Sequence, residues 1–142
     1  MNILIIERII RAFQLTLDLF NELTEESLGL KINNLPSNTI GKQAWCIIGA
    51  RESYFNALKH GEWKGFSCSL NNTKNKKEVL DKLLKSQNNI STFLKSNLNH
   101  NTSIKIILDL FEHEIQHHGQ LIRFIYANKL KFPNSWKERY TV

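Results

Sequence analysis

The sequence predicts an all-α protein, a four-helix bundle of the up-down type with a long connection between its second and third helices. Three observations lead to this prediction. Apolar residues recur at three- and four-residue spacing in four long segments, as they do in amphipathic helices. No segment shows the alternation of apolar and polar residues that marks a strand. Helices of about twenty residues with short or moderate connections favour a bundle.

The first helix is expected from Ile3 to Leu23, where the apolar residues form one stripe. It ends before Pro36 and the neighbouring asparagines, which break helical order. Thr39 is a suitable N-cap for the second helix, because its side-chain oxygen can accept from a free backbone N–H. His60 and Gly61 close that helix.

The next segment, from Gly61 to Thr73, contains Trp63 and Phe66. We expect these aromatic side chains to hold the loop over one end of the core, and a lid over a site is the alternative. A third helix is predicted from Lys76 to Leu98. After an Asn-rich turn, a fourth is predicted from its cap at Ser103 to Asn128.

Composition and the absence of repeats predict one domain over residues 1–142. Hydrophobic residues make up 42% and charged residues 23% of the chain, as in ordinary globular domains. Trp136 and Tyr140 in the tail are expected to dock on the bundle. Glu7 and Arg8 interrupt the apolar opening and no cleavage site follows, so we expect a cytoplasmic protein that does not enter a membrane.

The net charge of +6 permits an acidic partner, but the lysines between Thr73 and Lys85 are explained as the solvent-exposed face of a helix. No nucleic-acid motif is present, so no nucleic acid is expected as a partner. Cys46 and Cys68 are too few for a disulfide framework. In a reducing compartment each is a thiol or a metal ligand.

The stretch HEIQHHGQ, from His113 to Gln120, begins with the H-E-x-x-H pattern of metalloproteases. His113 and His117 are four residues apart on a helix, so their rings can share one divalent metal ion. The alternative is that both histidines are core-edge residues bonded to carboxylates or backbone. His118 points to another side of the helix, as a satisfied buried histidine or a subunit contact.

A peptidase is not expected. Glu114 could serve as the general base, but Gln120 and Arg123 stand where the longer metalloprotease motif has glycine and histidine. The chain also lacks an evident strand to hold an extended peptide. The fourth helix is apolar over most of its circumference, which predicts a homodimer formed partly through it.

Cys46 is the only soft ligand on the second helix. Its thiolate would complete a Cys-His-His set with one open position, although a free cysteine often just fills space in a core. Arg51 and Glu52 follow Cys46 and are expected to form a surface ion pair, with substrate orientation as the alternative.

Two segments carry a resemblance to a known family: TIGKQAWCIIGARESY from Thr39 to Tyr54, and HEIQHHGQL from His113 to Leu121. Together with the closing FPNSWKERY, they resemble the DinB-like family of bacterial four-helix bundles. The resemblance implies a metal site of three histidines, one on the second helix and two on the last. His113 and His117 match the pair, whereas Cys46 stands where the family has its other histidine.

The resemblance also implies a function. Some DinB-like proteins are S-transferases that use bacillithiol, mycothiol or glutathione, and in them a metal binds the thiol and lowers its pKa. We therefore expect a metal-dependent enzyme with zinc or nickel, a low-molecular-weight thiol and a small-molecule substrate. The alternative is a non-enzymatic, stress-related bundle protein whose metal site has degenerated at Cys46.

Overall fold

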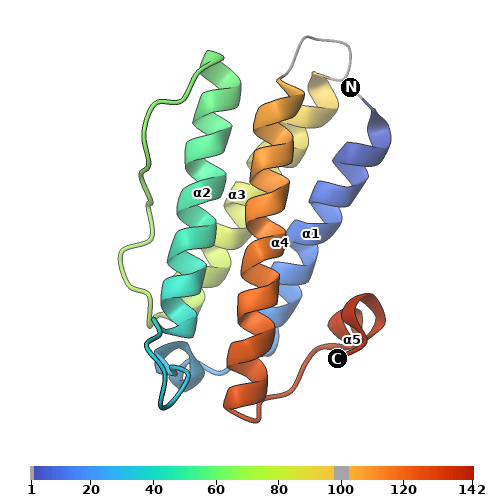
Figure 1. Cartoon of the computed structure of the whole chain (residues 1–142). Helices are drawn as coiled ribbons and strands as arrows, with labels where there is room; N and C mark the ends of the chain where they lie inside the picture. The colour runs from blue at the N-terminus through green and yellow to red at the C-terminus, as the bar shows by residue number, and fades with distance from the viewer. Residues whose placement is uncertain (1, 98–102) are drawn as a thin grey trace.

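The computed structural model describes residues 2–97 and 103–142, and their regular secondary structure is entirely helical, with no β-strand among them. Four long helices lie side by side, and a short fifth helix lies near the C-terminus (Figure 1). The α-helices are α1 (Ile3–Glu22), α2 (Ile40–His60), α3 (Lys76–Ser96), α4 (Ile104–Ala127) and α5 (Asn134–Tyr140), and a 3-10 turn, η1, spans Glu26–Gly29. The prediction of an all-α chain is confirmed. The expected turn after α3, with Leu98, falls largely outside the described residues.

The long connection predicted between the second and third helices is present, and it runs back along α2, so that α3 starts at the same end of the structure as α2 (Figure 1). In Figure 1, α1 and α4 run downwards while α2 and α3 run upwards, so α2 and α3 point the same way and the order is not a strict alternation. Each long helix packs on two neighbours: α1 and α2 each contact both α3 and α4. None of the described helices is long and apolar enough to cross a membrane.

Helix starts follow the capping residues that the sequence offers. Thr39 Oγ1 accepts from Lys42 N at 3.1 Å, and Ser103 Oγ accepts from Ile106 N, so both predicted N-caps are confirmed. Asn2 and Asn75 cap α1 and α3 in the same way. Gly61 ends α2 with φ 77°, a left-handed conformation that glycine adopts without steric cost.

The apolar stripes of the four long helices meet in two clusters of buried side chains. Burial of this apolar surface is the main force that holds the helices together. Members of the first cluster include Leu19, Ile47, Leu83, Leu121 and Trp136, and members of the second include Ile9, Phe13, Ala50, Ile90 and Ile107.

The connection between α2 and α3 lies along the side of α2 (Figure 1), which corrects the expectation that it covers one end of the core. The physical reason is Gly49, whose missing side chain leaves room for Phe66. A Cβ at Gly49 would lie 2.3 Å from Phe66 Cζ and 3.0 Å from Cys68 Cβ. Ser53 Oγ on α2 also accepts a hydrogen bond from Ser67 N in the connection at 3.0 Å.

The C-terminal tail docks on the helices as predicted. Trp136 is fully buried, and its Nε1 donates to the carbonyl oxygen of Leu15 in α1 at 2.6 Å. Tyr140 lies half-buried in the same place, with its ring centroid 5.3 Å from that of Trp136. The short α5 is therefore part of the packed structure.

Candidate metal centre

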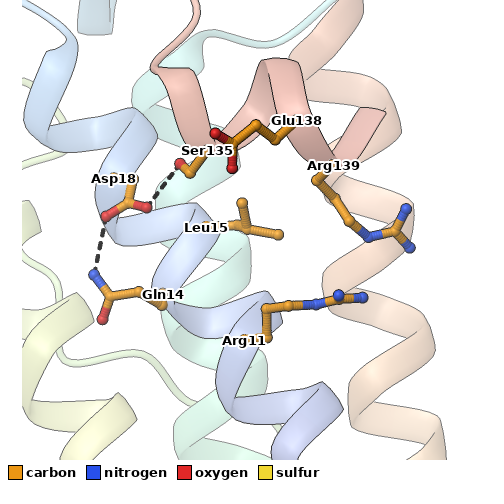
Figure 2. A pocket seen from close by; sticks show the side chains of 7 residues that line it. All are labelled: Arg11, Gln14, Leu15, Asp18, Ser135, Glu138 and Arg139. Atoms are coloured by element: carbon orange, nitrogen blue, oxygen red, sulfur yellow. Dashed lines mark hydrogen bonds between the residues drawn. The ribbon is translucent and has the colours of Figure 1, made fainter. Parts of the chain in front are cut away.

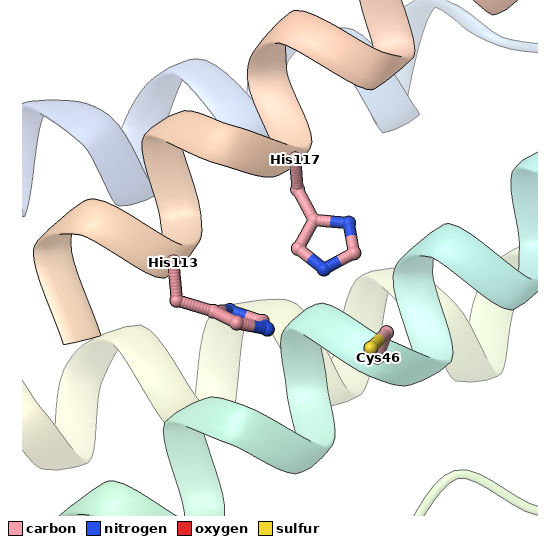
Figure 3. A group of neighbouring side chains, drawn as sticks. All are labelled: Cys46, His113 and His117. Atoms are coloured by element: carbon pink, nitrogen blue, oxygen red, sulfur yellow. The ribbon is translucent and has the colours of Figure 1, made fainter. Parts of the chain in front are cut away.

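Cys46, His113 and His117 meet between two neighbouring helices. Cys46 lies on α2, and the two histidines lie one turn apart on α4. Each residue offers one ligand atom, and the three atoms all lie within 4.8 Å of one another. Figure 3 shows both imidazoles extending from α4 towards the turn of α2 that carries Cys46. This Cys/His/His group could hold a metal ion.

The spacing of the donor atoms suits a small divalent cation. A tetrahedral zinc ion with Zn–S of about 2.3 Å and Zn–N of about 2.0 Å needs donors about 3.3–3.6 Å apart. The widest separation in the group exceeds this requirement by no more than about 1.5 Å, a gap that small rotations of three side chains can close.

His113 carries an unsatisfied polar atom. Its Nδ1 is buried and has no hydrogen-bond partner in the part of the chain that the structure describes. A buried polar atom without a partner costs free energy, and a metal ion bound at Nδ1 would supply the missing partner. The donor set and this nitrogen together fit a metal ion.

Gln43 fixes the orientation and tautomer of His117. Its Oε1 lies 2.5 Å from His117 Nδ1, and an amide oxygen can only accept, so Nδ1 carries the proton. The lone pair of the neutral ring is then on Nε2, free for a metal. Gln43 Nε2 donates to Asn38 Oδ1 at 3.1 Å, which fixes the amide in this orientation. Metal-binding histidines usually have such a partner on the other nitrogen.

The environment keeps both imidazoles neutral. Burial lowers the pKa of His113, and burial together with the nearby His113 lowers the pKa of His117 to about 4. Neutral rings offer a lone pair at physiological pH, as metal binding requires. Burial raises the pKa of the Cys46 thiol, so a metal ion has to displace its proton on binding.

Glu114 does not face this group. It is fully buried and paired with Arg51, whose Nη2 donates to its Oε1 at 2.5 Å and whose Nε donates to its Oε2 at 3.2 Å. Burial favours a raised pKa for Glu114, but Arg51, helped by His118 and Thr16, holds the pKa below its ordinary value. A carboxylate so engaged cannot serve as a base for a metal-bound water, which removes the peptidase interpretation.

The prediction of a surface ion pair between Arg51 and Glu52 is wrong. Arg51 is fully buried and paired with Glu114, while Glu52 Oε1 accepts from Ser69 N at 2.9 Å. An arginine can lie in the core here because a carboxylate from another helix neutralises it, and local sequence does not reveal such a partner.

His118 is a satisfied buried histidine, one of its two expected roles. Thr16 Oγ1 lies 2.6 Å from Glu114 Oε1 and 2.7 Å from His118 Nε2. Because the carboxylate only accepts, Thr16 donates to Glu114 and accepts from His118 Nε2–H. His118 Nδ1 then accepts from the Tyr140 hydroxyl at 2.6 Å. Burial lowers the pKa of His118 to about 4, in keeping with this neutral ring.

Two surface hollows lie near these networks. One, of about 370 Å³, is lined by Gln43, Gln120 and Arg123, so it adjoins the partner of His117. The other, of about 360 Å³, lies between α1 and α5. In Figure 2, Arg11 and Arg139 extend to the same side of this second hollow. Neither hollow is lined by Cys46, His113 or His117.

No protein-family model matches this sequence, and no curated protein sequence matches it. The likeness to the DinB-like family therefore stays a prediction based on the motif residues.

Sequence reasoning missed Gln43 as a partner of the candidate ligands. The signal was available, because Gln43 lies three residues before Cys46 and so shares its helix face.

Proposed function

We propose that this protein is a metal-dependent enzyme of the DinB-like type, which activates a low-molecular-weight thiol for transfer to a small electrophile. The observation that carries the proposal is the convergence of Cys46, His113 and His117 within 4.8 Å. Three protein ligands with a fourth position left open are typical of catalytic zinc sites, whereas structural sites have four.

Zinc or nickel would lower the pKa of a bound thiol and hold it as a thiolate at neutral pH. The chain supplies the remaining requirements. Gln43 keeps His117 in the tautomer that binds through Nε2. Cys46 and His113 are only half-buried, which leaves a path for a small thiol. The hollow beside Gln43 offers Arg123 and Gln120 to a carboxylate on that thiol.

Cys46 sets a limit on this chemistry. A thiolate ligand lowers the net charge at the metal by one relative to a third neutral histidine. The metal then stabilises a second thiolate less strongly, and we expect slower S-transfer than a three-histidine site would give. The alternative function, a non-enzymatic bundle protein, also rests on Cys46, because it takes this cysteine as the sign of a degenerated metal site.

The proposal includes a four-helix bundle that forms a homodimer through α4 in the cytoplasm of a bacterium. Ile104 and Leu108 of α4 are exposed apolar side chains that a second copy could cover. Light scattering that shows a monomer at micromolar concentration would reject the dimer and leave the metal site unaffected.

Metal analysis of protein purified without an affinity tag tests the function. Wild type is expected to bind one zinc or nickel ion per chain, and His113→Ala is expected to bind none tightly. His60→Ala is the matched control, because His60 is exposed at the end of α2 and lies outside the group. Wild type that takes up no more metal than His113→Ala would remove the basis of the proposal.

A thiol-transfer assay gives the second test. Wild type loaded with zinc or nickel is mixed with an aryl halide and with bacillithiol, mycothiol or glutathione in turn. Metal-dependent loss of the thiol with one of them supports the enzyme, and metal binding without any such loss supports the non-enzymatic alternative.

A further inference from the structure

The Arg51 guanidinium, on α2, contacts all three of the remaining long helices, α1, α3 and α4. It binds Glu114 of α4, and its Nη1 donates to Leu83 O and Ser86 Oγ of α3 at 3.1 and 3.2 Å. It also lies 4.2 Å from the ring centroid of Phe13 in α1. Arg51 itself is on α2, so one fully buried side chain joins four helices.

This arrangement tolerates only one alignment of α2 and α4. A shift of α4 by one residue would move Glu114 by about 1.5 Å along the axis and rotate it by about 100°. The carboxylate would then leave Arg51, and two charges would remain in the core without a partner, at high cost in free energy. Apolar side chains impose no such penalty, because they can repack in several ways.

The same two helices carry the candidate metal ligands. Glu114 adjoins His113 in sequence, and Arg51 lies five residues after Cys46 on α2. We infer that the Arg51–Glu114 pair is a positioning element for the metal site, holding α2 and α4 in the alignment that brings the Cys46 sulfur to the two imidazoles. The metal-binding part of this inference rests on the proposed function.

A role in stability alone would not require charges. Replacing a buried ion pair by apolar residues of similar volume is often neutral or stabilising. The double variant Arg51→Met with Glu114→Leu therefore separates alignment from stability. The groups it leaves behind keep partners, since Thr16 Oγ1 can donate to Ala12 O at 3.2 Å and Ser86 Oγ to Leu83 O at 3.0 Å.

Two measurements on the double variant test the inference. The first is its metal-free crystal structure, in which we expect the Cys46 sulfur to move relative to the imidazoles by more than about 0.5 Å, the tolerance of a functional constellation. The second is titration with cobalt(II), whose thiolate charge-transfer absorption reports a bond to sulfur. We expect the affinity to fall about 10- to 100-fold and that absorption to weaken.

Leu110→Ala is the matched control. It opens a cavity in α4 and lowers stability but leaves the ion pair intact, so it is expected to keep the cobalt spectrum of wild type. If the double variant fails to fold, Arg51→Lys replaces it, because lysine keeps the charge but cannot make the same set of directed hydrogen bonds.

A folded variant with unmoved donors and wild-type cobalt affinity would overturn the inference. Failure of the proposed function has a different signature: wild type would bind no cobalt, while displaced donors in the metal-free variant would still support the role of the pair in alignment.

Discussion

The buried ion pair makes a quantitative prediction about stability. Glu114→Gln keeps the shape of the side chain and removes its charge, so Arg51 is left as an unbalanced cation in the core. Glu114 accepts three hydrogen bonds, two from Arg51 at 2.5 and 3.2 Å and one from Thr16 at 2.6 Å, and both members of the pair are fully buried. Breaking such a pair from one side costs about 3–5 kcal/mol.

Urea denaturation followed by circular dichroism measures this cost. The midpoint is expected to fall while the slope stays unchanged, because the surface exposed on unfolding is the same. The loss is a large part of the total stability of an ordinary domain, about 5–15 kcal/mol. The double variant Arg51→Met with Glu114→Leu, which buries no charge, is expected to recover most of it.

Asp109→Asn is the control for the single variant. It removes an exposed ion pair with Lys105 on the same helix and is expected to leave the stability almost unchanged. If Glu114→Gln and Asp109→Asn lowered the free energy of unfolding equally, the reasoning would be refuted, because burial would then make no difference to how much an ion pair stabilises the protein.

Three further predictions follow from individual contacts. Gly49→Ala forces a Cβ into the Phe66 ring and should lower stability by about 1–3 kcal/mol, whereas Gly29→Ala meets nothing within 4 Å and should not; urea denaturation of both variants checks this. Trp136→Phe removes the donor to a buried carbonyl and should cost about 1–3 kcal/mol in the same assay, and wild-type stability would contradict it. Gln43→Leu removes the partner of His117 and should weaken zinc binding about 10- to 100-fold in a chelator competition, and unchanged affinity would show that the contact does not tune the site.

Local features of the sequence predicted much of the fold. The four long helices follow from apolar spacing, and the caps at Thr39 and Ser103 act on backbone groups three residues away. The closeness of His113 and His117 follows from helix geometry alone. Its residue type made Cys46 a candidate third ligand, and the resemblance matched it to the family's third ligand position, because no local rule relates residues on different helices.

The features that the sequence did not predict depend on contacts between distant segments. Arg51 looked like a surface residue because arginine is rarely buried without a partner, and its partner lies 63 residues away. Trp136 was expected to dock, but its partner, the Leu15 carbonyl, lies 121 residues away. The path of the connection along α2 depends on how Gly49 and Phe66 fit together.

X-ray absorption spectroscopy of the zinc-loaded, tag-free protein tests the central claim most directly, because it reports which atoms are bonded to the metal. The account predicts one sulfur at about 2.3 Å and two imidazole nitrogens at about 2.0 Å, with a further light atom in the open position. Zinc bound without sulfur, or with a single imidazole, would contradict the site formed by Cys46, His113 and His117.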